Sequence, residues 1–229
     1  MAKKILISWS SGKDSAWTLH VLQQQGGYEI AGLITTINSA FDRVAMHSSR
    51  RRLVEMQAAA AGLPLIAVPL PWPCSNTDYE CAMKTVCDQA IAQGVEAIAF
   101  GDLFLEDIRA YRERQLKETD LAPLFPLWRF PTDALAREMI DGGLRAKLVC
   151  IDPKKLSAEF AGREFDEHLL RDFPPEVDPC GENGEFHSFV YAGPMFSREI
   201  PVTVGERVQR EGFWYADLLQ ADSVGAAVD

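Results

Sequence analysis

The sequence has no long apolar run. None of its 229 residues falls in a stretch that approaches the ~20 apolar residues a membrane span requires. The N-terminus, a Met and an Ala before two lysines and a short apolar segment, lacks the longer apolar region and cleavage site of a signal peptide. The five cysteines include no C-x-x-C pair, and their odd number suits free thiols in a reducing compartment. We therefore expect a cytoplasmic protein with no membrane partner.

Positive charge is also scarce. Lys and Arg total 23 against 33 Asp and Glu, which gives a formal net charge of −10. Nucleic-acid-binding proteins usually have the opposite balance, because lysines and arginines neutralise phosphates. The composition therefore argues against nucleic acid as a partner. With 47% hydrophobic and 24% charged residues, the chain is otherwise typical of a globular protein that buries a sizeable core.

Two common nucleotide-binding signatures are absent. A Walker A loop has Gly five residues before its Gly-Lys pair and Ser or Thr directly after the Lys, but these positions hold Ile7 and Asp14. The dinucleotide fingerprint G-x-G-x-x-G does not occur either. A phosphate-binding loop in this chain must therefore be of another type.

The N-terminal segment nevertheless has the form of a phosphate cradle. An apolar run at residues 5–7 predicts a buried strand, and the apolar spacing from residue 16 onward predicts a helix. At such a junction Gly permits a tight turn, backbone N–H groups converge on an anion, and the helix contributes its positive end. The predicted phosphate-binding residues are Ser10, Ser11, Gly12, Lys13, Asp14 and Ser15. An ordinary strand–turn–helix capped by Asp14 or Ser15 is the alternative.

This loop resembles the SGGxDS-type loop of the N-type ATP pyrophosphatases. Ser11 is the departure, because that pattern usually has Gly at this position. Serine fits there at little cost if its φ is negative, so we expect a negative φ at Ser11.

Strands and helices alternate along most of the chain. Apolar, β-branched runs predict strands at residues 5–7, 29–37, 65–70, 95–100, 124–128 and 146–151. Helices are predicted up to residue 25 and at residues 48–61, 76–93, 105–119 and 132–140, with a loop at residues 40–47. This pattern predicts an α/β fold with a doubly wound parallel sheet. Because ligands of such sheets bind at the carboxyl ends of the strands, Thr35, Gly101 and Asp102 are expected beside the phosphate-binding residues.

The pattern of predicted strands and helices changes near residue 150. A polar helical stretch is predicted at residues 156–173, and short alternating segments at 186–191, 200–204 and 213–219 predict a small antiparallel lobe. We therefore expect two parts, an ATP-binding α/β domain over residues 1–150 and a smaller C-terminal substrate lobe over residues 151–229.

An acidic loop introduces the antiparallel lobe. Asp178, Glu182, Glu185 and His187 fall within ten positions and are separated by glycines, so they form either a solvated turn or a polar site. If the chain is extended from Glu185, that carboxylate and the His187 imidazole lie on one face of a strand. Their spacing matches no standard metal-binding pattern. The nearby Cys180 would suit sulfur transfer to a nucleobase, although the missing C-x-x-C and the acidic charge argue against it.

Taken together, these segments resemble the diphthine–ammonia ligase-type group of the adenine nucleotide alpha hydrolase superfamily. The matching stretches follow the order of that family and cover most of residues 3–205: SWSSGKDSAW, MHSSRRRLVEMQAAAAGLP, GDLFLEDIRAYRE, FPLW and DPCGENGEFHSFV. The resemblance implies cleavage of ATP to AMP and pyrophosphate, adenylation of a carboxylate, and its amidation by ammonia. In that family the acceptor is diphthine on elongation factor 2.

The resemblance also implies where the nucleotide binds. Asp14 would hold Mg²⁺ on the polyphosphate, since this cation prefers oxygen ligands. Adenine would lie near Thr35 and the pair Met46-His47. Arg109 and Arg112 share one face of the helix after Asp102, and Arg109 is the stronger candidate for the site.

The acceptor side would be formed by the acidic loop. The resemblance implies that Glu182, Glu185 and His187 face the acceptor and the incoming ammonia, so these residues and Asp14 are the catalytic candidates. Another acceptor, such as a small carboxylate metabolite or a tRNA base, is the alternative if the host lacks diphthamide, a modification of archaeal and eukaryotic factors. A nucleotide-sensing module that binds ATP without turnover is the non-enzymatic alternative.

Overall fold

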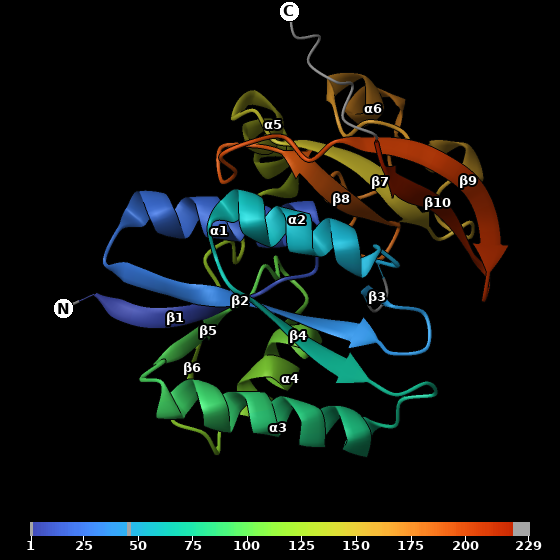
Figure 1. The fold of residues 1–229 in the computed structure, drawn as a ribbon. Coiled ribbons are helices and arrows are strands. Elements are labelled where there is room, and N and C mark those ends of the chain that lie inside the picture. Colours follow the sequence, from blue (N-terminus) through green and yellow to red (C-terminus); the bar gives the residue numbers. More distant parts are fainter. Residues whose placement is uncertain (1, 45–46, 222–229) are drawn as a thin grey trace, which may run out of the picture.

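Two β-sheets of different character make up the framework, with helices between and around them (Figure 1). The computed structural model describes residues 2–44 and 47–221. Met46, predicted to lie near the adenine, falls outside the described residues. Within the described ranges, no helix is both long enough and apolar enough to cross a membrane.

The first sheet, sheet A, is parallel apart from one short strand. Its parallel strands are β1 (Lys3–Ser8), β2 (Tyr28–Asn38), β4 (Leu65–Leu70), β5 (Ala97–Ala99) and β6 (Ala122–Leu124), and β3 (Arg43–Val44) pairs antiparallel with the end of β2. From the centre at β1 the chain moves outward through β2 and β4, then crosses back to β5 and β6. The strand order therefore reverses between β1 and β5, where doubly wound sheets bind their ligands. The predicted fold class is confirmed.

Helices cover both faces of sheet A (Figure 1). One face carries α1 (Lys13–Gln25) and α2 (Arg51–Ala61), and the other carries α3 (Asn76–Ala92) and α4 (Glu106–Leu116). The central strand β1 serves both layers, because Ile5 and Ile7 pack in one core cluster and Leu6 packs in the other. This double burial explains the continuous apolar run in the sequence.

The second sheet, sheet B, is antiparallel and lies beyond α1 and α2 in Figure 1. Its strands, in spatial order, are β8 (Phe186–Ala192), β7 (Arg145–Ile151), β10 (Phe213–Gln220) and β9 (Val202–Arg210). The prediction that residues 146–151 extend the parallel sheet is wrong, because β7 pairs antiparallel with β8 and β10. A short run that is buried on both faces fits either sheet, so hydrophobic periodicity cannot assign it.

Three further boundaries differ from the predictions. The helix predicted at residues 156–173 is a 3₁₀ turn at Ala158–Phe160 and the short helix α6 (Glu167–Asp172). They are separated by Gly162, whose φ of +83° is unfavourable for a helix. The strand predicted at residues 124–128 ends at Leu124, and the loop predicted at residues 40–47 contains β3. The helix at residues 132–140 is confirmed as α5 (Thr132–Asp141).

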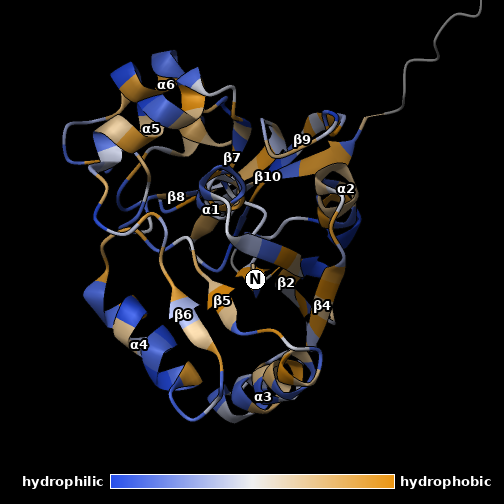
Figure 2. Cartoon of the chain, turned by 90° about the vertical axis from the view of Figure 1, so that its left-hand side faces the viewer, coloured by the Kyte–Doolittle hydropathy of each residue, from blue (hydrophilic) through white to orange (hydrophobic). Residues whose placement is uncertain are grey.

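Helix α2 packs against both sheets. Val54 is buried in the core cluster shared with β1, whereas Leu53 packs with Phe189 of β8 and Leu218 of β10. Figure 2 shows the same layers from another side, with α3 and α4 at one end of the molecule and α5 and α6 at the other. In that view α4 is largely hydrophilic, in agreement with its exposed position over sheet A. This packing brings the start of β8 next to the start of α1.

Candidate active site

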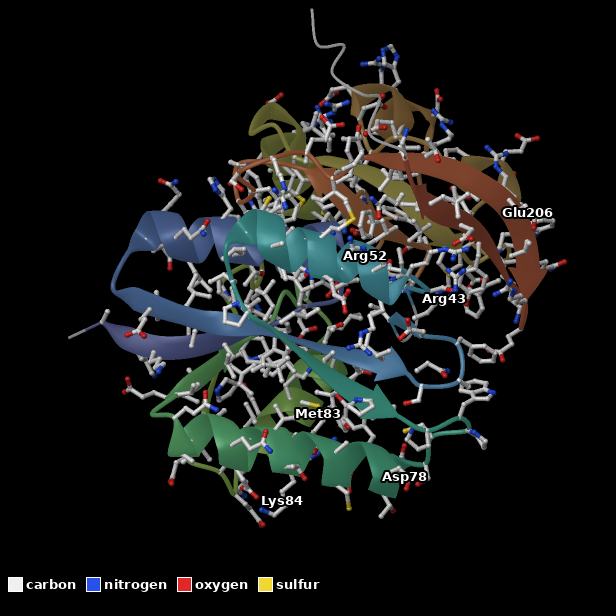
Figure 3. The ribbon with its side chains drawn as sticks, viewed as in Figure 1. Arg43, Arg52, Asp78, Met83, Lys84 and Glu206 are labelled. Carbon is white, nitrogen blue, oxygen red and sulfur yellow. The ribbon has the colours of Figure 1, made fainter. Side chains whose placement is uncertain are left out.

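A cleft of about 500 Å³ opens at the carboxyl ends of the sheet A strands, where the strand order reverses. One wall comes from the loop between β1 and α1, another from the end of β5 and from α4, and a third from the acidic loop and β8. Met83 also lines the cleft and projects from α3 toward sheet A, whereas the neighbouring Lys84 points outward (Figure 3). Of the predicted residues, the lining contains Ser10, Lys13, Asp14, Ser15, Thr35, His47, Gly101, Asp102, Glu182 and His187.

The loop predicted to bind phosphate, residues 10–15 and called the phosphate-binding loop below, turns tightly between β1 and α1. Its hydroxyl groups hold the turn, because Ser15 Oγ donates to the Gly12 carbonyl at 3.0 Å and Ser10 Oγ accepts from the Gly12 amide at 3.3 Å. Gly12 precedes α1, and a Cβ there would lie 2.8 Å from the His47 ring. The first amides of a helix have no partner within the helix, so this end of α1 can bind an anion.

Ser11 has a positive φ of 72°, so the predicted negative φ is wrong. The side chain is fully buried, and its Oγ lies 2.8 Å from Ser49 Oγ. This left-handed conformation is unfavourable for residues with a Cβ, which explains why the related loop usually has Gly there. Hydrogen bonds from neighbouring elements therefore have to hold Ser11 in place.

Lys13 and Asp14 form a close ion pair at the start of α1. Lys13 Nζ lies 2.8 Å from both carboxylate oxygens of Asp14. The ammonium group also lies over the Phe186 ring, 5.5 Å from its centroid. Burial acts to lower the pKa of Lys13, but Asp14 and the other acidic groups around it, including Glu182, together raise the pKa above its ordinary value. The cleft therefore contains a buried, permanently charged cation beside the helix N-terminus.

The end of β5 approaches the first turn of α1 closely. A Cβ on Gly101 would lie 2.8 Å from the carbonyl carbon of Asp14, so no side chain fits there. The next residue, Asp102, has a buried Oδ2 without a hydrogen-bond partner among the described residues, 3.6 Å from Arg112 Nε. Burial raises the pKa of Asp102, and the charge of Asp14 raises it further. Asp102 therefore lies near Asp14 and is paired by charge with Arg112, while its Oδ2 accepts no hydrogen bond from the described residues.

The end of β2 and the segment after β3 form the far side of the cleft. Thr35 lines the cleft, and its buried Oγ1 has no hydrogen-bond partner among the described residues. The His47 ring packs against the His187 ring with centroids 4.6 Å apart, and its Nδ1 lies 3.2 Å from the Ser188 carbonyl oxygen. Burial, followed by the neighbouring His187, lowers the pKa of His47 well below its usual value. Burial and Lys13 lower that of His187 to about 4. Both rings are therefore neutral near pH 7.

Within the acidic loop, Glu182 reaches the cleft. Its Oε1 accepts hydrogen bonds from the amides of Leu103 at 2.8 Å and Phe104 at 3.4 Å, which tie this loop to the segment after β5. Burial raises the pKa of Glu182 to about 7, and the charge of Asp14 contributes to the rise. The carboxyl group can therefore gain or lose a proton near neutral pH.

Asp178 and Glu185 hold the acidic loop from within. Asp178 Oδ1 accepts from the amides of Cys180 at 2.9 Å and Glu182 at 3.2 Å. Glu185 is 3% exposed and lies outside the cleft lining. Its Oε1 accepts from the Asp178 amide at 3.1 Å and from Asn183 Nδ2 at 3.2 Å. These two carboxylates therefore shape the loop that presents Glu182.

The predicted residues that the structure does not bring to the cleft include Arg109. Its guanidinium group lies 4.8 Å from the centroids of the Phe125 and Trp128 rings, and its Nε donates to Glu113 at 2.8 Å. Arg112, on the same face of α4, lines the cleft instead. The spacing of the two arginines in sequence identified the helix face but not the residue that reaches the site.

Ser188 is a site residue that the sequence analysis missed. Its Oγ accepts a hydrogen bond from the Lys13 amide at 3.1 Å, so β8 contacts the first turn of α1 directly. The partners are 175 positions apart in the chain, and no local pattern links them. Cys180 also lines the cleft, but burial raises the pKa of its thiol to about 12. It is therefore protonated and unsuited to act as a thiolate.

The carboxylates of the site could hold a metal cation only together with a bound phosphate ligand. No group of three or more His, Cys, Asp and Glu side chains within residues 2–44 and 47–221 is arranged to hold a metal ion. Magnesium usually binds through one or two carboxylates together with substrate phosphates. Asp14 and Asp102 both line the cleft and could supply these carboxylates, although Asp14 is paired with Lys13 and Asp102 Oδ2 lies 3.6 Å from Arg112 Nε.

The relatives of this chain share one name. Diphthine–ammonia ligase of Danio rerio is 26% identical over 225 residues, which cover 87% of this chain and 86% of that protein. The protein of that name from Schizosaccharomyces pombe is 25% identical over 226 residues, covering 90% of this chain and 37% of its own length. The human protein of that name is 31% identical over 123 residues, or 50% of this chain and 45% of that protein. The chain thus aligns with less than half of the yeast and human relatives.

The family assignment rests on two matches in chain order. Residues 3–123 match the diphthamide synthase N-terminal domain, and residues 131–223 match the diphthamide synthase C-terminal domain. The first match contains residues 10–15 and all of sheet A except the last residue of β6, and the second contains sheet B and the acidic loop. The chain belongs to the diphthamide synthase family.

Proposed function

We propose that this protein is an ATP-dependent ligase that adenylates a carboxylate and amidates it with ammonia, as in the last step of diphthamide synthesis. The observation that carries this proposal is a single cleft with anion-binding groups on one side and proton-accepting groups on the other. On one side the N-terminus of α1 presents backbone amides and the buried Lys13 ammonium group. On the other, Glu182 and His187 supply proton-accepting groups. Phosphates bind on the first side, and the acceptor and ammonia meet on the second.

The triphosphate of ATP binds to the phosphate-binding loop in this proposal. The α1 amides and Lys13 stabilise the charge that develops on pyrophosphate as the α–β phosphoanhydride bond breaks. Asp14 and Asp102 would hold Mg²⁺, which would offset the negative charge of the phosphates when bound. Adenine lies toward Thr35 and His47, at the end of β2.

Glu182 and His187 act on the acceptor side. An acceptor carboxylate oxygen attacks the α-phosphorus and releases pyrophosphate. The nitrogen of ammonia then attacks the acyl carbon, AMP leaves, and the attacking nitrogen gives up a proton. Glu182, whose pKa is about 7, suits the transfer of that proton at neutral pH. The His187 ring also lines the cleft and is neutral near pH 7, but with a pKa of about 4 it is a weaker proton acceptor than Glu182.

We also propose a division of labour along the chain. Residues 1–150 would bind the nucleotide, and residues 151–229 would form the smaller substrate lobe. The acidic loop and β8 support this division, because they are the C-terminal segments that line the cleft. The acceptor in this proposal is diphthine on elongation factor 2. The names of the relatives give diphthine and ammonia as the substrates of those proteins.

A pyrophosphate-release assay tests the proposed function. Purified protein is incubated with ATP, Mg²⁺ and ammonium, with or without elongation factor 2 that carries diphthine. We expect release, together with AMP and the amidated factor, only when the modified factor is present. Release with a small carboxylate or a tRNA instead would redirect the proposal to another acceptor. ATP binding without release under any condition would identify a nucleotide-sensing module and contradict it.

A further inference from the structure

Gln57 is a fully buried polar residue in α2 that the proposed reaction does not use. Its Nε2 donates to the carbonyl of Ser11 at 3.0 Å and to the carbonyl of Val190 at 2.6 Å. Its Oε1 accepts from the indole Nε1 of Trp9 at 2.9 Å. The side chain therefore joins three elements: the segment after β1, the phosphate-binding loop and β8 in sheet B.

The partners fix the orientation of this amide. The Trp9 indole can only donate a hydrogen bond, and the carbonyls of Ser11 and Val190 can only accept one. A flipped Gln57 would lose all three hydrogen bonds inside the protein. The amide is thus a rigid bridge between the loop and the second sheet.

Gln57 contacts the loop at Ser11, whose backbone conformation is unfavourable. Ser11 has a φ of 72°, which an L-residue adopts only when its surroundings hold it there. Its carbonyl accepts from Gln57 Nε2 and also from the Val190 amide at 3.0 Å. Its hydroxyl lies 2.8 Å from Ser49 Oγ, so every polar atom of Ser11 beyond the amide is engaged. The peptide that follows this turn leads directly into the first turn of α1.

We propose that Gln57 is a positioning residue for ATP, which holds Ser11 in its left-handed conformation and thereby pre-forms the phosphate-binding loop. This inference rests on the proposed function, because it assigns the loop to the triphosphate. Without the amide, the loop relaxes toward negative φ at Ser11 and has to be reorganised by the ligand. That reorganisation reduces affinity for ATP in particular.

The first test is Gln57→Met, which keeps the length of the side chain and removes its hydrogen bonds. We expect the Kd for MgATP, measured by calorimetric titration, to rise about tenfold, since preorganisation is lost while the ligand contacts remain. The KM for the acceptor should stay unchanged. Val54→Ala is the matched control, because Val54 is equally buried on the same helix and packs in the core. It should lower the melting temperature and leave the Kd for MgATP unchanged.

A rescue separates positioning from general stability. Glycine adopts a positive φ without the Cβ penalty, so Ser11→Gly no longer needs the bridge to hold the turn. The double variant Ser11→Gly with Gln57→Met should recover most of the lost affinity for MgATP, but not the lost melting temperature. A purely structural role for Gln57 predicts no such recovery of affinity.

The outcomes distinguish this inference from the proposed function. If the wild-type protein does not bind MgATP, the proposed function fails. If wild type and Gln57→Met bind MgATP equally well, the positioning role is overturned while the function stands. If Gln57→Met does not fold, Ser49→Ala loosens Ser11 from its hydroxyl side. Unchanged MgATP affinity in folded Ser49→Ala protein would then overturn the inference in the same way.

Discussion

The phosphate-binding loop and the acidic loop contribute to the same cleft in different ways. In the first, residues 10–15, the chemistry comes from the backbone and from one part-buried ion pair between neighbours in sequence. In the second, two of the carboxylates face inward and shape the loop, and Glu182 faces the cleft. A site built from backbone amides follows from the path of the chain. A site built from side chains also depends on which way each one turns.

Asp14→Ala tests the phosphate-binding loop and should have the largest effect. Asp14 is the partner of the buried Lys13, and we propose it as one of the two carboxylates that hold Mg²⁺. We expect pyrophosphate release to fall by a factor of about 10² to 10³ or more, in a protein that still folds. The rate is measured by a coupled pyrophosphate assay and folding by circular dichroism. Asp107→Ala, on an exposed acid of α4, is the control, and turnover retained in Asp14→Ala would contradict the site.

Gly101→Ala tests whether the path of the chain alone sets the phosphate site. The new Cβ would meet the backbone of Asp14 at 2.8 Å, so the first turn of α1 has to move. We expect the Kd for MgATP to rise at least about tenfold, because displacements near 1 Å at a positioned group cost this much or more. Gly94→Ala is the matched control, since its φ of +76° makes it unfavourable but a Cβ there meets nothing within 4 Å. It should lower stability and leave affinity unchanged.

Glu185→Ala probes the inward-facing half of the acidic loop. Glu185 Oε1 is the acceptor for the Asp178 amide and Asn183 Nδ2. Its removal should lower the free energy of unfolding by about 1–3 kcal/mol, because buried donors lose their partner. We expect product formation to stop, because the loop that presents Glu182 loses its support. The Kd for MgATP should be preserved, since Glu185 lies outside the cleft lining. Urea unfolding and calorimetric titration provide both values, and a loss of ATP affinity would show that the two halves are not separable.

We expect Glu182→Gln to have the smallest effect, which is a change in the pH dependence of the free energy of unfolding. Its folded pKa of about 7 exceeds the ordinary value of 4.5, so the native state binds more protons than the unfolded state between these values. Stability conferred at low pH is therefore lost as pH rises through this window. The variant lacks this term, so its free energy of unfolding relative to wild type should increase between pH 4.5 and pH 7. Parallel urea titrations at both ends of the window measure it, and a difference independent of pH would argue against a buried carboxyl group at Glu182.

The sequence was sufficient to predict the parallel sheet and the tight turn between β1 and α1. Both depend on local signals, namely apolar runs of strand length and a Gly-containing turn between a strand and a helix. The φ of Ser11 could not be predicted, because it is held by Gln57 and Val190, which are remote in the chain. The assignment of β7 to sheet B failed for a related reason, since strand partners are set by the tertiary fold.

The acidic loop shows that sequence alone does not predict which side chains face the cleft. Its composition indicated a polar site, and Glu182 and His187 do line the cleft. Nothing in the spacing distinguishes Glu182 from Glu185, because the positive φ of Gly184 at 81° redirects the chain between them. The choice between Arg109 and Arg112 is similar, since a helix face is readable from sequence but the aromatic rings that hold Arg109 are not.

The structure of the protein with ATP bound tests the central claim most directly. The account predicts that the triphosphate lies against the amides of residues 10–15, with Lys13 Nζ within hydrogen-bond distance of a phosphate oxygen. Nucleotide bound elsewhere in the molecule, or a phosphate-binding loop that remains empty at saturating ATP, would contradict it.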